Sequence, residues 1–414
     1  MARLKGFQKL TLIDDALQTW LNVLQVKKPR EVTMPLNEAL NRVLASDVIA
    51  EEDLPRFYRS AVDGYALKAE DTTGASQFNP ATFQIIESEE VDSKHAKQIW
   101  TGNPLPKGAD AVVMIENTKK TEDALEVWIQ LARGGNVSKK GEDVKKGENI
   151  LKAGTRLKPY HLALLAAMGN NEAKVVEKPR IAILATGNEL AEVGCQPSEN
   201  QIFDSNRVML STMCQEIGAE PVDLGIAKDD VAEIAEKLKI GLRKCDGVIT
   251  SGGTSVGGLD LVPDAVNQVG NPGVVVHGLA LRPAMPTALA ALDGKPVMIL
   301  SGNPVAAIIG FEVFARPLIC KMLGMAREEP RPTVIAVMTR KVATTLGRKT
   351  FVRVRVTQKN SALLAEPVSA RGSGAISTMM RGNGFVIVPE NREGVTEGEL
   401  VTVRLFGNLG TVNE

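Results

Sequence analysis

The chain has 414 residues, more than a single hydrophobic core usually serves, so we expect two to four domains. Hydrophobic residues make up 44% and charged residues 24%, which is ordinary for a globular protein. Lys plus Arg and Asp plus Glu both total 49, so the net charge is zero. We therefore expect neither a nucleic-acid partner nor a membrane partner.

The cysteines and the N-terminal residues bear on where the protein acts. The cysteines form no CxxC pair, which argues against a zinc site or a disulfide framework and favours a reducing cytoplasm. We interpret all four as buried hydrophobic residues: Cys195, Cys214, Cys245 and Cys320. We recognise no signal peptide and no run long enough to span a bilayer, so a cytoplasmic protein is expected.

The first half of the chain changes character after two predicted helices. Residues 10–25, LTLIDDALQTWLNVLQ, have apolar residues at helical spacing, with Thr11 positioned to cap the helix. Residues 35–48, PLNEALNRVLASDV, predict a second helix. From about 82 to 158, short β-rich runs such as AVVMIENT alternate with turn signals such as TGNPLPKGAD, which predicts a mostly β insertion.

The second half begins with alternating strand and helix patterns. RIAILATG at 180–187 is a continuous apolar run, typical of a strand buried on both faces. Similar strands at 220–227, 247–253 and 296–302 are separated by helical patterns, so we expect a largely parallel sheet with helices on both faces. After residue 328 the strands alternate apolar and polar residues, which predicts a separate small β domain.

Glycine-rich polar loops follow three of these strands: ATGNEL, TSGGTSVGG and LSGNPVAA. In a parallel sheet the carboxyl ends of the strands form the ligand-binding edge, and glycines let backbone N–H groups approach an anion. Ser251, Thr254, Ser255 and Ser301 add hydroxyl donors. Neither a Walker A loop nor GxGxxG is present, so we predict phosphate binding without a familiar nucleotide motif. Any single loop could instead be a tight strand-to-helix turn.

Carboxylates follow the same strands, at Glu189, Asp229, Asp230 and Asp260. They would repel a phosphate unless a divalent cation lay between, and Mg²⁺ is commonly held by one or two carboxylates plus substrate phosphates. Helix capping is the alternative, and for Asp230 it is the better interpretation. With three histidines in the whole chain, a histidine-based relay or metal cluster is not expected.

Taken together, the segments SAVDGYAL, TGNPLPKGADAVVMIENT, ILATGNEL, VITSGGTSVGGLDLV and ILSGNPVAA resemble the molybdopterin molybdenumtransferase family, to which the gephyrin E domain is related. The resemblance runs in the same order over nearly the whole chain. It implies a cytoplasmic homodimer of four-domain subunits, with the active site in a cleft between subunits. The implied fold is multidomain α/β plus β, with a three-layer αβα domain and a mostly parallel sheet. The expected domains are an N-terminal helix (1–26) packing on the α/β domain, a small α/β linking domain (27–50 and 150–178), a β-rich insertion (51–149), the molybdopterin-binding α/β domain (179–328) and a C-terminal β domain (329–414).

The resemblance implies that adenylylated molybdopterin is cleaved with Mg²⁺, releasing AMP while molybdate or tungstate is inserted. The implied catalytic residues are Asp63, Thr101, Glu189, Asp229, Asp260 and Arg282, with Asp229 and Asp260 as metal ligands. Asp63 and Thr101 would complete the site of the neighbouring subunit, although the Asp-Gly of VDGY is also a turn signal. The implied substrate-binding residues are Thr186, Gly187, Ser251, Gly252, Gly253, Thr254, Ser255, Gly257, Ser301, Gly302, Asn303 and Pro304.

One stretch departs from the family pattern of a lysine followed by Pro-Gly-Lys-Pro, because here the letters are LALRPAMPTALA. Arg282 replaces the first lysine and keeps its charge in a planar fork, while Ala284 replaces the glycine. Met285 replaces the second lysine and removes a cation, so an altered preference between molybdate and tungstate is our hypothesis. Two other functions stay open: a catalytically weak paralogue that binds molybdopterin as a scaffold, and a molybdopterin adenylyltransferase, which would consume ATP.

Overall fold

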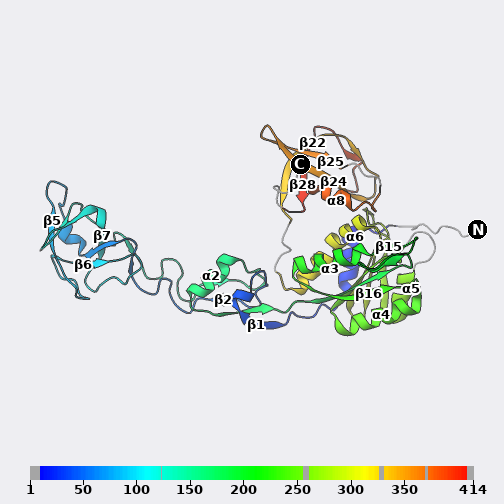
Figure 1. Ribbon diagram of the computed structural model, residues 1–414, viewed down its shortest axis with the longest axis horizontal. Helices are drawn as coiled ribbons and strands as arrows, with labels where there is room; N and C mark the ends of the chain where they lie inside the picture. Colours follow the sequence, from blue (N-terminus) through cyan, green and yellow to red (C-terminus); the bar gives the residue numbers. More distant parts are fainter. Residues whose placement is uncertain (1–9, 123, 255–260, 326–330, 369–371, 408–414) are drawn as a thin grey trace, which may run out of the picture. The chain divides into compact units, whose positions relative to one another are not determined.

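The computed structural model describes residues 10–122, 124–254, 261–325, 331–368 and 372–407, which form parts of two compact units. Unit 1 comprises Met1–Val32 and Val176–Glu414, and unit 2 comprises Thr33–Val175. Figure 1 follows the chain through both units, and each is described by itself below. No helix among the described residues is long and apolar enough to cross a bilayer.

The centre of unit 1 is a six-stranded sheet in the order β16-β13-β17-β21-β20-β18. The first four strands are parallel: β16 (Glu220–Ala227), β13 (Arg180–Thr186), β17 (Gly247–Ser251) and β21 (Lys295–Leu300). β20 (Ala288–Leu292) and β18 (Pro272–His277) are antiparallel and complete one edge. The expected mostly parallel sheet is confirmed, although the alanine-rich β20 had no recognisable strand pattern.

Helices cover both faces of this sheet (Figure 1). α4 (Val231–Lys244) and α5 (Leu261–Val269) share one core with Ala182 and Leu184, the side chains of β13 that point to their face. α3 (Ser205–Ile217) packs with α6 (Pro304–Gly310) and α7 (Arg316–Met322), and the π-helical segment η4 (Phe311–Ala315) joins the last two. Asp230 caps α4 by accepting a hydrogen bond from Glu233 N at 2.8 Å, as its sequence position indicates.

Helix α1 (Ile13–Val23) packs against β18 and β20. The Trp20 indole is fully buried, and its Nε1 donates to Ala290 O at 2.7 Å. The expected capping role of Thr11 is wrong, because the helix begins after Leu12 without a side-chain cap. Thr11 instead pairs with the chain before β19: its N donates to Gly278 O at 3.0 Å, and its O accepts from Ala280 N at 2.8 Å.

The C-terminal domain is a closed five-stranded barrel in the order β24-β25-β22-β28-β26, with β26 pairing back to β24. Its strands are β22 (Thr333–Met338), β24 (Lys349–Lys359), β25 (Ala362–Pro367), β26 (Gly384–Val388) and β28 (Leu400–Leu405). The short strand β19 (Leu281–Arg282) leaves the α/β domain and joins β24 in parallel. The stretch LALRPAMPTALA, which departs from the expected family pattern, therefore includes the junction of the two domains.

Smaller elements of unit 1 connect these layers. β14 (Leu190–Ala191) pairs with β15 (Ile202–Phe203), β23 (Val342–Ala343) pairs with β27 (Gly394–Val395), and α8 (Ser377–Arg381) precedes β26. All four cysteines are free, but they do not share one environment. Cys214, Cys245 and Cys320 are buried as expected, whereas Cys195 is exposed, so the interpretation of all four as buried residues is wrong for Cys195.

Unit 2 contains a six-stranded sheet in the order β7-β4-β6-β5-β9-β8. Its strands are β4 (Gly64–Leu67), β5 (Ala81–Ile85), β6 (His95–Ile99), β7 (Ala111–Met114), β8 (Thr118–Lys120) and β9 (Leu125–Val127). The short helices η2 (Ala69–Thr72) and η3 (Ile115–Asn117) lie in its connections. Its core is built from alternating residues such as Tyr65, Leu67, Phe83 and Leu125.

The helix expected over 35–48 is wrong. Only one 3-10 turn, η1 (Leu36–Glu38), follows β1 (Glu31–Pro35), and Asn41 takes a positive φ of 62°. Val43 and Leu44 are buried by bridging to Arg156 and Val175, so tertiary pairing overrides the helical spacing of the apolar residues. The remaining elements are α2 (Pro159–Ala167), β12 (Glu172–Val176), which pairs with β1, and the pairs of β2 (Val48–Ile49) with β11 (Asn149–Leu151) and β3 (Arg59–Ser60) with β10 (Val137–Ser138).

Candidate active site

Three loops meet at the carboxyl edge of the sheet, because β13, β17 and β21 are adjacent parallel strands in register. Gly252, with φ of 96°, lies so close to Thr186 that an added β carbon would be 2.4 Å from Thr186 O. A β carbon on Gly302 would in turn lie 3.6 Å from the Gly252 Cα. Only glycine allows this approach of backbone to backbone at Gly252. The predicted residues Ser255, Gly257 and Asp260 lie outside the described residues.

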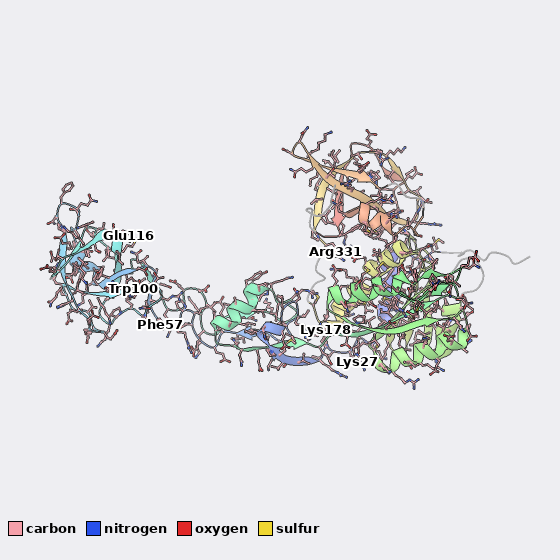
Figure 2. The ribbon with its side chains drawn as sticks, viewed as in Figure 1. Lys27, Phe57, Trp100, Glu116, Lys178 and Arg331 are labelled. Carbon is pink, nitrogen blue, oxygen red and sulfur yellow. The ribbon has the colours of Figure 1, made fainter. Side chains whose placement is uncertain are left out.

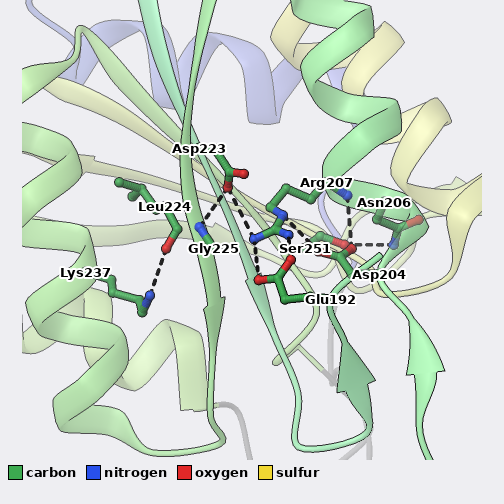
Figure 3. A network of polar contacts seen from close by, with 9 residues as sticks. All are labelled: Glu192, Asp204, Asn206, Arg207, Asp223, Leu224, Gly225, Lys237 and Ser251. Atoms are coloured by element: carbon green, nitrogen blue, oxygen red, sulfur yellow. Dashed lines mark hydrogen bonds and ion pairs between the residues drawn. The ribbon is translucent and has the colours of Figure 1, made fainter. Parts of the chain in front are cut away.

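Asn206, which no sequence pattern singled out, joins two of these loops, and Figure 3 shows its hydrogen bond to Ser251. Its Nδ2 donates to Ser251 Oγ and to Gly302 O, both at 2.8 Å. The side chain is only 7% exposed, and its Oδ1 has no hydrogen-bond partner among the described residues. The amide therefore holds the loop after β17 beside the loop after β21.

A charged network holds the start of α3, and thus Asn206, in place (Figure 3). Arg207 contacts Glu192, lies 3.2 Å from Asp204 Oδ2 and lies 3.3 Å from Asp223 Oδ1. Asp204 also caps α3 by accepting from Arg207 N at 3.1 Å. Burial raises the pKa of the Asp204 carboxyl against the opposing effect of Arg207. Removing Arg207 would leave the buried Asp204 without its counter-ion.

Two predicted carboxylates reach the same edge. The Glu189 carboxylate folds over Gly187, where an added β carbon would lie 2.5 Å from Glu189 Oε2. Asp229 Oδ2 accepts from Asn188 N at 3.1 Å, and Asn188 Oδ1 accepts from Asp229 N at 3.2 Å. These reciprocal bonds fix Asp229 beside the loop after β13. No group of three or more His, Cys, Asp or Glu side chains suited to a metal occurs in the part of the chain that the structure describes.

The hydroxyl groups at the carboxyl edge of the sheet differ in whether their protons are already used in hydrogen bonds within the protein. Thr254 Oγ donates to Pro286 O at 2.8 Å and lies 3.3 Å from His277 Nε2, so its proton is already used within the protein. Ser301 Oγ accepts from Asn303 N at 3.2 Å, and it donates no hydrogen bond among the described residues. Thr186 Oγ is buried with no hydrogen-bond partner among the described residues. Thr186 and Ser301 are therefore the better placed donors for a ligand.

The third loop borders a cavity of about 430 Å³. Ser301 and Asn303 line it from the α/β domain, Arg282 and Met285 from the stretch around β19, and Arg348 and Arg353 from the barrel. No Asp or Glu is among the described residues that line it. Three guanidinium groups without a facing carboxylate make this cavity suited to an anion.

Arg353 is the most constrained of these cations. It donates to Thr378 Oγ at 2.6 Å and, more weakly, to Gly372 O at 3.4 Å, and no carboxylate pairs with it among the described residues. Burial lowers the pKa of the Arg353 guanidinium. Arg282 is exposed, and its NH1 lies 3.3 Å from Thr345 Oγ. Sequence reasoning missed Arg348 and Arg353, because only the pairing of β19 with β24 brings the barrel to this loop.

Ala284, where the resemblance leads us to expect a glycine, has an unusual backbone conformation. Ala284 is buried with φ of 87°, in the left-handed region that favours glycine. An alanine in this region costs on the order of 1 kcal/mol. Met285, where the resemblance leads us to expect a lysine, follows it at the cavity wall.

The two predicted residues of unit 2 contact each other directly. Asp63 Oδ1 accepts from both Thr101 N and Thr101 Oγ, each at 2.7 Å. These two hydrogen bonds lower the pKa of the Asp63 carboxyl. Exposed apolar side chains lie close by in the chain: Trp100 is 52% exposed and Ile115, whose N donates to Asp63 O, is 39% exposed. Figure 2 labels Trp100 and Glu116, which follows Ile115.

The fold and this edge define a multidomain α/β protein whose glycine-rich loops gather beside an arginine-lined cavity. Three sequence families match successive parts of the chain: "MoeA N-terminal region (domain I and II)" at 11–169, "Probable molybdopterin binding domain" at 182–321 and "MoeA C-terminal region (domain IV)" at 336–406. The chain belongs to the molybdopterin molybdenumtransferase (MoeA) family and is a transferase of molybdenum cofactor biosynthesis.

Individual relatives agree with this assignment. A molybdopterin molybdenumtransferase from Staphylococcus aureus (strain COL) is 34% identical over 402 residues, which cover 95% of each chain. One from Bacillus subtilis (strain 168) is 36% identical over 384 residues, covering 90% of this chain and 89% of the relative. The crystal structure of the molybdopterin biosynthesis moeA protein from Pyrococcus horikoshii OT3 has a TM-score of 0.83 and 32% identity, covering 96% of this chain and 100% of that one. The expected family and fold class are thereby confirmed.

Proposed function

We propose that this protein inserts molybdate or tungstate into adenylylated molybdopterin, with Mg²⁺-dependent cleavage of the phosphoanhydride and release of AMP. The observation that carries the proposal is the Asn206 amide, which joins the loops after β17 and β21 beside the arginine-lined cavity. A phosphoanhydride and an oxyanion must lie next to each other in this reaction. The glycine-rich loops offer a site for the phosphoanhydride, and the cationic cavity that they border offers an adjacent site for the oxyanion.

The loops would hold the phosphoanhydride. The absence of side chains at Gly252 and Gly302 lets a ligand approach the backbone closely, although Gly252 N itself donates to Leu300 O at 3.1 Å. Thr186 and Ser301 donate no side-chain hydrogen bond among the described residues, so their hydroxyl protons are available to a ligand. Such donors stabilise the charge that develops on the leaving phosphate as the anhydride breaks.

Asp229 fits the role of a magnesium ligand. Its Oδ2 accepts from Asn188 N, whereas no hydrogen bond to its Oδ1 is formed among the described residues. Mg²⁺ is usually bound by one or two carboxylates together with substrate phosphates, so a single carboxylate of this kind can serve. When bound, the ion would neutralise charge on the anhydride. Asp260 stays a predicted second ligand.

Arg353, Arg282 and Arg348 would hold the oxyanion, and Arg353 provides the sharpest test. In Arg353→Met the molybdate concentration for half-maximal cofactor formation should rise by about ten-fold or more, the scale of one lost charge-assisted contact. Arg353→Lys should recover part of the molybdate affinity, because lysine restores the positive charge without the planar guanidinium that binds an oxyanion through two N–H groups. The control is Arg340→Met, which removes an exposed arginine of the same barrel paired with Glu366. Equal molybdate dependence in Arg353→Met and Arg340→Met would refute the assignment.

We further propose that the protein is a cytoplasmic homodimer in which Asp63 and Thr101 complete the neighbouring subunit's site. Asp63→Asn and Asp229→Asn should each be inactive alone. When the two are unfolded and refolded together, half of the dimers are mixed, and each mixed dimer has one site without either change. Activity should then recover to about a quarter of wild type. No recovery, with mixed dimers demonstrated by differential tags, would mean that one subunit supplies the whole site.

A further inference from the structure

A second cavity, of about 350 Å³, lies at the other edge of the same sheet. Because β13, β17 and β21 are parallel, their first residues share one edge, and Arg180, Pro296 and Asp246 line the cavity there. The strands place this edge roughly 15–20 Å from the carboxyl edge. The cavity is therefore separate from the candidate active site. We call it the basic cavity.

The basic cavity concentrates positive charge in a chain whose net charge is zero. Eight of its lining residues are Lys or Arg, and two are Asp or Glu. Its cations come from two sources. Some belong to the segments 27–30 and 177–180, and the others to the end of α4 and the start of β21. Figure 2 labels Lys27 and Lys178, one from each of the two segments.

Half of the eight cations have partners within the protein. Arg30 lies 3.8 Å from Glu177, Arg180 lies 3.2 Å from Glu220, and Arg243 lies 3.5 Å from Glu236. Lys295 Nζ donates to the carbonyl groups of residues 242 and 245. No hydrogen bond or ion pair of the side chain is formed by the other four among the described residues: Lys27, Lys28, Lys178 and Lys244.

The end of helix α4 does not account for these four lysines. The carbonyl groups at a helix C-terminus attract cations. Here Lys295 Nζ and Arg180 NH1 already occupy three of them, with Arg180 donating to Lys244 O at 3.1 Å. The four lysines are exposed, so their ammonium groups are accessible to a ligand, and an anion between them would offset their mutual repulsion.

We propose that the basic cavity binds a small anion bearing two or more phosphate groups, held mainly by Lys27, Lys28, Lys178 and Lys244. Ammonium groups bind phosphate as point charges, and the cavity volume suits a small ligand. Such a ligand would tie the segments 27–30 and 177–178 to the body of the α/β domain. The site is independent of the proposed function at the opposite edge.

Calorimetric titration of the full-length protein with tripolyphosphate tests the proposal. EDTA is present throughout, so that magnesium-dependent binding at the candidate active site does not contribute. The triple variant Lys27→Gln, Lys28→Gln, Lys178→Gln should bind at least about ten-fold more weakly than wild type. The matched control is Lys119→Gln, Lys120→Gln, Lys359→Gln, which removes three exposed lysines elsewhere and should bind like wild type. Replacing the first three lysines by Arg should retain binding.

Two further arms identify the ligand class and the location. ATP is titrated alongside tripolyphosphate: tighter ATP binding identifies a nucleotide as the source, equal binding identifies the phosphate chain alone, and both support the proposal. Citrate should bind more weakly, and citrate binding as tight as tripolyphosphate would overturn the phosphate assignment.

Acetylation of Lys27, Lys28, Lys178 and Lys244 should slow when tripolyphosphate is bound. Unchanged acetylation, or equal affinity in the two triple glutamine variants, would overturn the site.

Discussion

Asn206 donates a hydrogen bond to Ser251 Oγ over 2.8 Å, although the two residues are 45 positions apart in the chain. Because the same amide also donates to Gly302 O, we expect Asn206→Asp to place a carboxylate against a carbonyl and to separate the two loops. Activity should fall by about ten-fold or more, with a loss of stability of about 1–3 kcal/mol. The measurements are AMP release and urea denaturation. Asn200→Asp, an exposed change in the same domain, is the control, and equal activity of both variants would contradict the positioning role.

The contact between Asp63 and Thr101 predicts a defined pH dependence. The two hydrogen bonds lower the pKa of the folded Asp63 carboxyl, so their contribution to stability is present above the unfolded pKa of about 3.8. It is lost as the pH falls through the lower folded pKa. Thr101→Val removes the hydroxyl donor and keeps the backbone donor, so the pKa of Asp63 should move part of the way back up. An NMR titration of the Asp63 carboxyl carbon measures this. Thr121→Val, whose hydroxyl donates to Ala124 O, should leave it unchanged.

Arg331, labelled in Figure 2, links the barrel to the α/β domain through Glu312 at 2.7 Å and Glu216 at 2.8 Å. Burial alone would lower the pKa of Arg331, but the two carboxylates raise it. Arg331→Met leaves the nearly buried Glu312 with Arg316 at 3.9 Å as its remaining counter-ion and should cost about 2–3 kcal/mol. The exposed pair of Arg340 and Glu366 offers the control, because Arg340→Met should cost less than about 1 kcal/mol. Urea denaturation compares them, and similar shifts of the two midpoints would contradict this link.

Met285 lines the cavity at a position where the resemblance leads us to expect a lysine, so Met285→Lys should add a cation where the oxyanion is expected. We expect the molybdate concentration for half-maximal cofactor formation to fall by a few-fold, and the ratio of molybdate to tungstate use to change. Met285→Gln separates polarity from charge and should leave both values near wild type. Identical profiles in wild type and Met285→Lys would remove the hypothesis of an altered oxyanion preference.

The sequence by itself determined the features that depend on neighbouring residues. The apolar run of β13, the Asp230 cap and the glycine-rich loops were recognisable because strand burial, capping and backbone freedom are read from a few adjacent letters. Residues 35–48 show the limit of such reasoning. Their apolar residues have helical spacing, but no α-helix forms, because Val43 and Leu44 form β-bridges with distant segments.

Only the tertiary structure decided which of these features share a site. The Asn206 amide spans loops that come together through strand register, and Arg353 reaches the cavity only because β19 joins the barrel. The basic cavity likewise gathers lysines from four separate parts of the chain, at 27–28, 178, 244 and 295. Such groupings follow from pairings between remote strands, and local spacing carries no information about which remote segments will pair.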